Sequence, residues 1–226
     1  AIRGVTEARE GRSHVVTTVI EHPATERPCA WLARHGWSVT RVGVDADGRA
    51  RVDEAREVID GDTALVTVMH SNNETGVLQP VEELAQLAHA AGALVHTDAA
   101  QSVGKVRVRV RDVGVDLLSV AGHKLYAPKG VGALYVRGGT PIMPFSLGAG
   151  HERGLRPGTE NVASIVGLGT ACEAAMRDLD EVSARLLTLR EILWERLASA
   201  VPGLAINGHR ELRLPNTLNV RFPDAS

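Results

Sequence analysis

The amino-acid sequence predicts an α/β fold, in which a mostly parallel β-sheet is flanked by helices and followed by the start of a smaller α+β domain. Three observations predict this architecture. Short apolar runs alternate with helical stretches through the first two-thirds of the chain. Small polar clusters follow several of these runs, and from about residue 159 two long helical patterns replace the alternation. Such a strand–helix–strand rhythm favours parallel strands joined by helices that cover both faces of the sheet.

Six short runs of mainly apolar residues predict the strands, at residues 14–20, 38–44, 63–69, 93–97, 116–120 and 131–136. Helices are expected at residues 25–35 and 80–91. In the second helix, Pro80 suits the first turn and Glu82 and Glu83 suit the positive end of the helix dipole. Gly92 then supplies a stop signal.

The last third of the chain has a different character. Residues 161–177 and 180–200 have helical periodicity, and the second segment places four leucines on one face, namely Leu186, Leu189, Leu193 and Leu197. Short strands are expected at residues 204–206 and 217–222. We therefore expect a large domain over residues 1–160, and connecting helices with an incomplete small domain over residues 161–226. Because both ends of the pattern are abrupt, we expect the chain to be a piece of a longer protein.

Composition and charge exclude several classes of protein. A formal net charge of −2 gives no electrostatic reason to bind nucleic acid or an anionic membrane, and 3% aromatic residues are too few for base stacking. No apolar stretch approaches the roughly 20 residues of a membrane span, and the first residues lack a signal-peptide pattern. Two distant cysteines, Cys29 and Cys172, favour a reducing cytoplasm. We expect both thiols to be buried and inert.

Lysine is rare in this chain. Of 25 basic residues only Lys105, Lys124 and Lys129 are lysines, and the other 22 are arginines. Arginine serves solubility as well as lysine does, but it cannot supply an amine that loses its proton and attacks a carbonyl carbon. Lys124, in the segment Gly-His-Lys after the predicted strand 116–120, is therefore our candidate for an imine-forming residue.

Polar residues gather after three predicted strands, at residues 71–76, 98–101 and 122–124. In sheets of this kind ligands bind outside the carboxyl ends of the strands. Pyridoxal phosphate needs a lysine for its aldehyde and a buried carboxylate to keep its ring nitrogen protonated, and Lys124 and Asp98 fit these roles. Asn73 and Gln101 are candidates for hydrogen bonds to the cofactor, and His22 for a ring that lies flat against it.

Several ordered motifs carry a resemblance to a known family: Ser71-Asn72-Asn73-Glu74-Thr75-Gly76, His96-Thr97-Asp98-Ala99-Ala100-Gln101, Gly122-His123-Lys124 with Tyr126, and Gly154-Leu155-Arg156-Pro157-Gly158-Thr159-Glu160-Asn161. Together they resemble the cysteine desulfurases of the class V aminotransferase group, which are close to selenocysteine lyases. The likeness covers nearly the whole chain. It implies the large domain of a fold-type I pyridoxal-phosphate enzyme.

The resemblance also implies an activity and partners. The expected enzyme is a cytoplasmic homodimer that removes sulfur from L-cysteine, leaves alanine and passes a persulfide to a sulfur-acceptor protein. By resemblance, Lys124 is the imine lysine and Asp98 the partner of the pyridinium. His22 is the stacked imidazole, which also assists proton transfer, and Asn73 and Gln101 are polar contacts of the cofactor. His123 lies near the cofactor phosphate, and Thr159 matches a residue that reaches the phosphate of the neighbouring subunit.

The chain departs from the family pattern in three places. Ala121 stands where the family has a hydroxyl residue, which removes one expected hydrogen bond to the phosphate. The family's phosphate loop is expected before residue 1. The cysteine that takes the sulfur and the arginine that holds the substrate carboxylate are expected beyond Ser226, because residues 214–220 resemble the strand that leads toward that cysteine.

Four alternatives stay open at this point with different weight. A selenocysteine lyase is the nearest, an aminotransferase is less favoured, and a non-catalytic scaffold would keep the fold without the chemistry. A nicotinamide dehydrogenase is disfavoured, because no phosphate-binding glycine fingerprint opens a helix after the first strand. His96 and Asp98 would suit a metal, but no third ligand stands at a recognisable spacing, so we expect no metal site.

Overall fold

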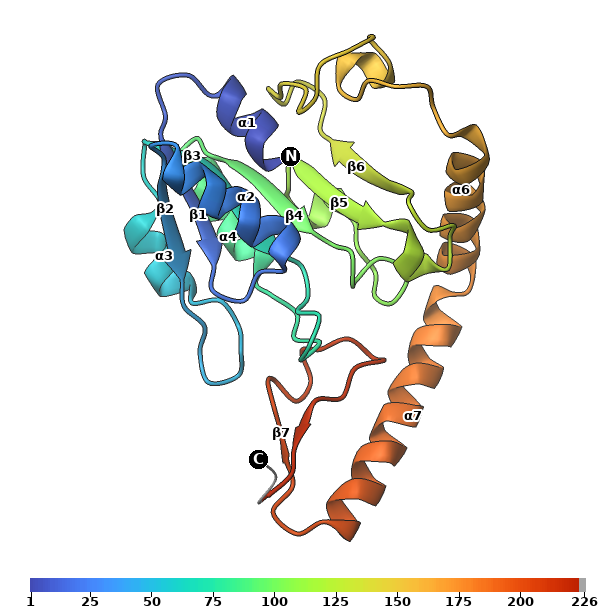
Figure 1. Ribbon diagram of the computed structural model, residues 1–226. Helices are drawn as coiled ribbons and strands as arrows, with labels where there is room; N and C mark the ends of the chain where they lie inside the picture. The colour runs from blue at the N-terminus through green and yellow to red at the C-terminus, as the bar shows by residue number, and fades with distance from the viewer. Residues whose placement is uncertain (224–226) are drawn as a thin grey trace.

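The computed structural model describes residues 1–223 of the chain. Its centre is a six-stranded sheet in the order β2-β1-β3-β4-β5-β6 (Figure 1). The strands are β1 (His14–Thr18), β2 (Ser38–Val42), β3 (Thr63–Met69), β4 (Leu94–Asp98), β5 (Leu117–Ala121) and β6 (Gly132–Val136). Neighbouring strands are parallel except for β6, which runs antiparallel to β5. The predicted α/β architecture with a mostly parallel sheet is confirmed.

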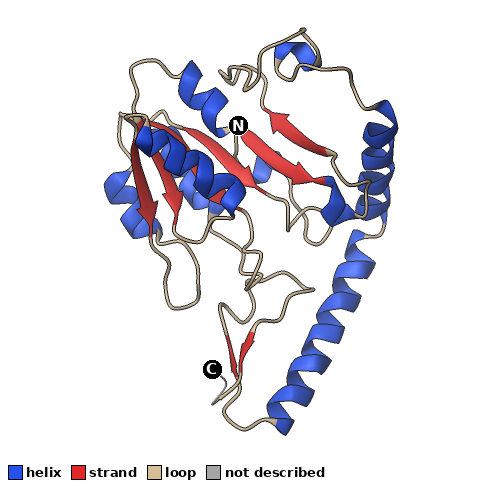
Figure 2. Ribbon diagram, viewed as in Figure 1, coloured by secondary structure: helices blue, strands red, loops and turns tan. Residues whose placement is uncertain are grey.

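Helices connect the strands and extend the chain beyond them (Figure 2). They are α1 (Ile2–Ala8), α2 (Pro23–Arg34), α3 (Val52–Val58), α4 (Val81–Ala90), α5 (Val110–Val113), α6 (Val162–Arg177) and α7 (Leu179–Ala200), with 3-10 turns η1 (Gly122–Leu125) and η2 (Glu152–Gly154). All the helices that the sequence predicts are present. The short helices α1, α3 and α5 were not predicted, because segments of at most seven residues carry little periodic signal.

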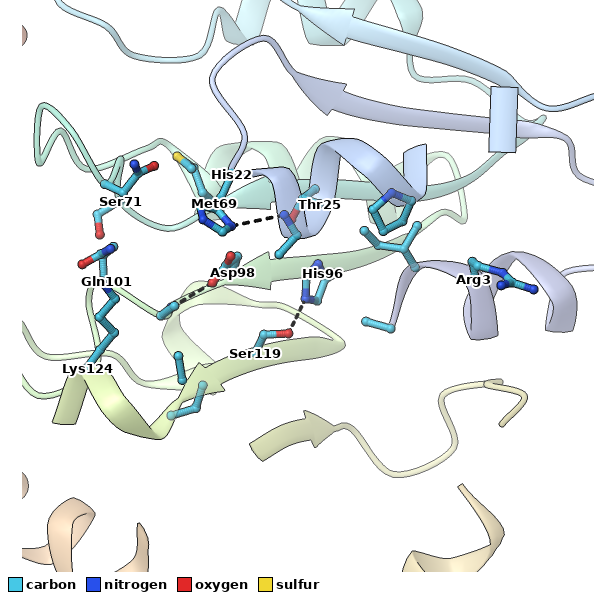
Figure 3. Close-up of a pocket in the computed structure, with 18 of the residues that line it drawn as sticks. Arg3, His22, Thr25, Met69, Ser71, His96, Asp98, Gln101, Ser119 and Lys124 are labelled. Atoms are coloured by element: carbon cyan, nitrogen blue, oxygen red, sulfur yellow. Dashed lines mark hydrogen bonds between the residues drawn. The ribbon is translucent and has the colours of Figure 1, made fainter. Parts of the chain in front are cut away.

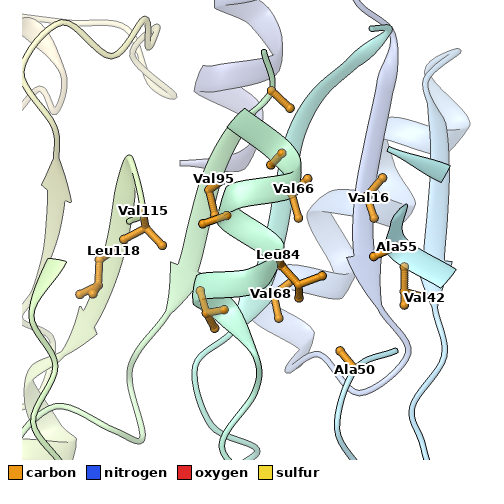
Figure 4. Close-up of a cluster of buried hydrophobic side chains, with 14 of the residues drawn as sticks. Val16, Val42, Ala50, Ala55, Val66, Val68, Leu84, Val95, Val115 and Leu118 are labelled. Atoms are coloured by element: carbon orange, nitrogen blue, oxygen red, sulfur yellow. The ribbon is translucent and has the colours of Figure 1, made fainter. Parts of the chain in front are cut away.

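Alternation of side chains along the strands divides the core into two layers. Val15 on β1 and Leu65 on β3 pack with α1 and α2 on one face of the sheet. Val16 and Val66 point to the other face, where α3 and α4 cover them (Figure 4). Helices therefore cover both faces of the sheet at its central strands, which explains why β3 is a continuous apolar run that is buried along its whole length.

Two predicted strands of the large sheet end earlier in the structure than in the sequence pattern, and the strand predicted at residues 217–222 is reduced to residues 220–221. β1 stops at Thr18 and β2 at Val42, each two residues short of the predicted end. Val19 is 55% exposed and begins the turn that leads into α2. At the start of α4, Pro80 is the residue before the first turn, whereas Gly92 follows the helix with a φ of +71°, as its predicted role as a stop signal requires.

The C-terminal third runs along α6 and α7 to a pair of short antiparallel strands, β7 (Ala205–Ile206) and β8 (Val220–Arg221). The predicted leucine face of α7 is largely uncovered by the described residues, since Leu189 and Leu193 are 52% and 50% exposed. No helix among residues 1–223 is long and apolar enough to cross a membrane. The division of the chain near residue 160 into two domains stays a prediction.

Candidate active site

A cavity of about 620 Å³ lies where β3, β4 and β5 reach their carboxyl ends. Six of the seven predicted site residues line it: His22, Asn73, Asp98, Gln101, His123 and Lys124. Figure 3 shows four of them, His22, Asp98, Gln101 and Lys124, around the same space. They come from separate segments, and the parallel topology brings these segments together at one edge of the sheet.

Lys124 lies in η1, the 3-10 turn that follows β5. The turn is held in place by Leu125 and Ala127, which are buried in one cluster with Leu168 of α6. Gly122 is required by close packing, because a Cβ atom there would lie 2.6 Å from the main-chain oxygen of Val131. The Lys124 side chain is exposed toward the cavity while its turn is anchored in the core.

Asp98 is the last residue of β4 and lies in register with Met69 on β3 and Ser119 on β5. Its Oδ1 accepts a hydrogen bond from the main-chain N–H of Ala100, at 2.9 Å. The side chain therefore caps a turn rather than an α-helix. Within the described residues Oδ2 makes no hydrogen bond, so this oxygen is available to a group in the cavity.

His22 is the N-cap residue of α2, and its Nδ1 accepts a hydrogen bond from the main-chain N–H of Ala24, at 3.2 Å. An acceptor nitrogen carries no proton, so the neutral imidazole has its proton on Nε2. The ring is exposed and lines the cavity (Figure 3). This cap explains the local fold, because a residue in extended conformation before Pro23 starts the helix.

The two asparagines after β3 have different tasks. Oδ1 of Asn72 accepts hydrogen bonds from the main-chain N–H groups of Glu74 and Thr75, both at 2.9 Å, and so shapes the turn. Asn73 is exposed and lines the cavity. The turn geometry is therefore supplied by Asn72, while Asn73 faces the cavity. Gln101 also lines the cavity. Its main-chain oxygen accepts a hydrogen bond from Nζ of Lys105 at 3.0 Å, which fixes the backbone at this position.

Thr159 is the predicted site residue that does not line the cavity. It is exposed, in the segment between η2 and α6. Its proposed contact with a second subunit stays a prediction.

A hydrogen-bond network in the wall of the cavity, formed by Thr67, His96 and Ser119, was not predicted as part of the cofactor site. Nδ1 of His96 is hydrogen bonded to Oγ1 of Thr67 at 2.8 Å, and Nε2 to Oγ of Ser119 at 2.9 Å. Burial lowers the pKa of His96 to about 3, so the ring is neutral. Both ring nitrogens are thus already paired, and residues 1–223 contain no group of three or more His, Cys, Asp or Glu side chains arranged to hold a metal ion.

Other lining residues also escaped sequence reasoning, among them Arg3 of α1, Ser71 and Phe145. Ser71 had a signal, since it opens the polar cluster after β3, and its Oγ is hydrogen bonded to that of Ser102 at 2.6 Å. Arg3 and Phe145 had none, because they reach the cavity from remote segments, where the guanidinium of Arg3 lies over the ring of Phe145, 4.9 Å from its centroid.

The cysteines lie outside this site. Cys29 is fully buried in α2, and burial raises the pKa of its thiol to about 12. Cys172 is half-buried on α6 and packs beside Leu125 and Leu168. The expected burial is confirmed for Cys29 but not for Cys172, and the inertness of both thiols stays a prediction.

The comparisons with known proteins agree with this geometry. The family model for class V aminotransferases matches residues 1–226. The chain belongs to this family. A cysteine desulfurase from Gluconacetobacter diazotrophicus is 48% identical over 223 residues, which cover 98% of this chain and 56% of that protein. The resemblance to cysteine desulfurases is thereby confirmed, and the chain spans about half the length of the curated relatives it matches.

Solved structures lead to the same family. A NifS-like protein superposes with a TM-score of 0.94 at 39% identity, covering 99% of this chain and 62% of that one. A structure described as SspA in complex with cysteine superposes with a TM-score of 0.83 at 34% identity, covering 98% and 62%. The mostly parallel sheet with its flanking helices is the fold shared with these two solved structures.

The donor set of the cavity fits pyridoxal phosphate, the cofactor that the family implies. An amine, a carboxylate with one free oxygen and an imidazole line one space, from Lys124, Asp98 and His22. The volume of about 620 Å³ is within the range of small-molecule sites. The chemistry of the lining residues and the volume of the cavity therefore both fit pyridoxal phosphate.

Proposed function

We propose that this chain is part of a pyridoxal-phosphate-dependent cysteine desulfurase, which removes sulfur from L-cysteine and leaves alanine. The single observation that carries the proposal is the convergence of Lys124, Asp98 and His22 on one cavity in a chain of this family. The cysteine in the SspA complex supports the choice of substrate, because that protein shares this fold at 34% identity.

In this proposal Lys124 holds the cofactor and then acts as a base. Among the described residues its amine is the one lysine nitrogen on the cavity wall, and its turn is fixed by buried neighbours. Bound there, pyridoxal phosphate supplies an aldehyde carbon and an electron-withdrawing ring. When it is not bonded to the cofactor, the Nζ of Lys124 would be the base that takes the proton from Cα of the substrate.

Asp98 and His22 are the proposed contacts of the cofactor ring, and both line the cavity. Oδ2 of Asp98 would hold the protonated ring nitrogen of the cofactor and keep it cationic, because a nearby carboxylate favours the charged form. His22 would lie against the ring, and its Nε2–H is free to donate a hydrogen bond into the cavity. Asn73 and Gln101 add polar contacts, and His123 lies on the side assigned to the phosphate.

The finer parts of the proposal concern the whole protein. We propose a cytoplasmic homodimer, in which Thr159 reaches the phosphate of the second subunit. The sulfur leaves as a persulfide for an acceptor protein that builds iron–sulfur clusters, thiolated nucleosides or sulfur-modified DNA. In the whole protein, a cysteine thiolate would take the sulfur as the persulfide and an arginine would bind the substrate carboxylate.

The test is alanine formation from L-cysteine by the natural full-length protein supplied with pyridoxal phosphate. We expect equal amounts of alanine and sulfide in the presence of a thiol reductant, and no alanine from the Lys124→Ala variant. Production of pyruvate or of another keto acid in place of alanine would contradict the proposal. Rates on cysteine and selenocysteine, measured side by side, decide between a desulfurase and a selenocysteine lyase.

A further inference from the structure

Glu21 is a carboxylic acid beside the cavity that the proposed chemistry does not use. It directly precedes His22 in the turn after β1. Its Oε1 accepts a hydrogen bond from Oγ1 of Thr18, at 2.6 Å, and another from the main-chain N–H of Met69, at 2.9 Å. Thr18 ends β1 and Met69 ends β3, so one oxygen atom joins the carboxyl ends of two adjacent parallel strands.

The other oxygen of this carboxyl group is buried and has no hydrogen-bond partner among the described residues. Burial, together with the negative charges of Asp98 and Glu26, raises the pKa of Glu21 to about 7 against the lowering effect of its two hydrogen bonds. A buried, half-satisfied carboxylate is costly, so the neutral form is favoured up to near-neutral pH.

The surroundings of Glu21 are mainly acidic. Asp98 approaches from β4, while Glu26 and the Cys29 thiol approach from α2. The cation on β2, Arg41, is paired with Glu26, with its Nη2 2.7 Å from Oε1. His22 adjoins Glu21 in the chain. Ionisation of Glu21 therefore adds a second negative charge to the side of the cavity that holds Asp98.

We propose that Glu21 is a positioning residue of the cavity: it holds the turn that carries His22 against the end of β3, and its ionisation places a second carboxylate charge beside Asp98. Its bearing on the cofactor rests on the proposed function, since His22 and Asp98 are the assigned ring contacts. The hydrogen bonds and the acidic surroundings exist without the cofactor, so they can be tested independently.

The charge is tested by NMR on the ¹⁵N-labelled chain without cofactor, between pH 5 and 9. The amide of Met69 donates to Oε1 of Glu21, so its shift reports the ionisation of that carboxyl group. We expect one step with a midpoint near 7, absent from Glu21→Gln and retained in the matched control Glu26→Gln. A midpoint near 4.5, the ordinary value for glutamate, or a step that persists in Glu21→Gln would overturn the proposal.

The positioning is tested in the same samples through the amide of Ala24, which donates to Nδ1 of His22. Glu21→Gln keeps an acceptor oxygen, so we expect this resonance to stay in place, whereas Glu21→Ala removes the bridge and shifts it. An Ala24 resonance that is unchanged in Glu21→Ala would overturn the positioning role.

Affinity for pyridoxal 5′-phosphate, followed by absorbance, provides the link to function. We expect Glu21→Ala to bind about tenfold more weakly, and Glu21→Gln to bind within about twofold of the parent chain. Equal affinity of Glu21→Ala and the parent would overturn the link to the cofactor. If the parent binds no pyridoxal phosphate, the proposed function fails, while the Met69 and Ala24 resonances still decide the role of Glu21.

Discussion

Asp98 on β4 lies in register with Ser119 on β5, and Ser119 is five residues before Lys124. The carboxylate and the lysine turn therefore leave the sheet at neighbouring strand ends. Beneath them, Ser119 is hydrogen bonded to His96, which fixes β5 to the strand that carries Asp98. The relative position of the amine and the carboxylate is thus set by strand pairing and a buried network rather than by a loop.

The first prediction concerns Gly122. Replacing it with alanine places a Cβ atom 2.6 Å from the main-chain oxygen of Val131, and backbone cannot yield as a flexible side chain can. We expect Gly122→Ala to lower the free energy of unfolding by about 2 kcal/mol and to weaken cofactor binding, because the Lys124 turn must shift. Urea denaturation and absorbance titration measure both effects. Gly138→Ala is the matched control, since a Cβ atom there meets nothing within 4 Å.

The second prediction concerns the charge of Asp98. Asp98→Asn keeps an oxygen that accepts the Ala100 N–H bond, so the turn should persist, but it removes the negative charge opposite the cofactor ring. We expect affinity for pyridoxal phosphate to fall about tenfold to a hundredfold, as for the loss of a charged hydrogen bond, with unchanged stability. Asp112→Asn, on the exposed surface of α5, should change neither property. Unaltered affinity in Asp98→Asn would remove Asp98 from the site.

The third prediction concerns acid stability. Burial lowers the pKa of His70 to about 4 and that of His96 to about 3, from 6.5. Below pH 6.5 these two histidines are protonated in the unfolded chain but stay neutral in the folded chain. The free energy of unfolding therefore falls as the pH falls below 6.5. Between pH 7 and 5 each histidine should cost about 2 kcal/mol. Glu21 acts in the opposite direction, because its pKa is raised to about 7 and the folded form binds its proton first.

The variant His70→Gln removes the contribution of one of these two histidines to the loss of stability at low pH. It should reduce the loss of unfolding free energy between pH 7 and 5 by about 2 kcal/mol, measured by urea denaturation at both pH values. His35→Gln, on the exposed end of α2, is the control and should leave the loss unchanged. Equal losses in all three proteins would show that the His70 ring is protonated in the folded chain.

The fourth prediction concerns the contact between α7 and the C-terminal segment. Arg190 is 7% exposed, and its Nη1 donates to the main-chain oxygen of Leu214 at 2.8 Å. We expect Arg190→Met to cost about 2 kcal/mol, because a buried carbonyl loses its partner. Hydrogen exchange near residues 212–214 should quicken as well. The exposed Arg196→Met is the matched control, and an equal cost in both variants would contradict the account.

Much of the fold was predictable because long, periodic segments carry their own signal. β3 is buried along its length and α4 has its acidic first turn and its glycine stop, so both were found within about one residue. The site residues at the strand ends were predictable for a topological reason, since parallel strands bring the residues at their carboxyl ends to one edge of the sheet.

The rest depends on contacts between remote segments, which no local pattern records. Arg3 and Phe145 line the cavity from segments that are distant in sequence, and Glu21 becomes a buried acid only because Met69 and Asp98 lie against it. Val19 has the composition of a strand residue, yet the chain turns there to begin α2. Thr159 has a predicted role that requires a second subunit.

The central claim is that Lys124 is the amine that holds pyridoxal phosphate, and the scarcity of lysine makes the test direct. The chain is incubated with pyridoxal phosphate, reduced with borohydride, digested and examined by mass spectrometry. The account predicts a stable pyridoxyl modification on Lys124, with Lys105 and Lys129 unmodified, and no such modification in Lys124→Ala. Modification of Lys105 or Lys129 in preference to Lys124, or a yellow, reducible chromophore that survives in Lys124→Ala, would contradict it.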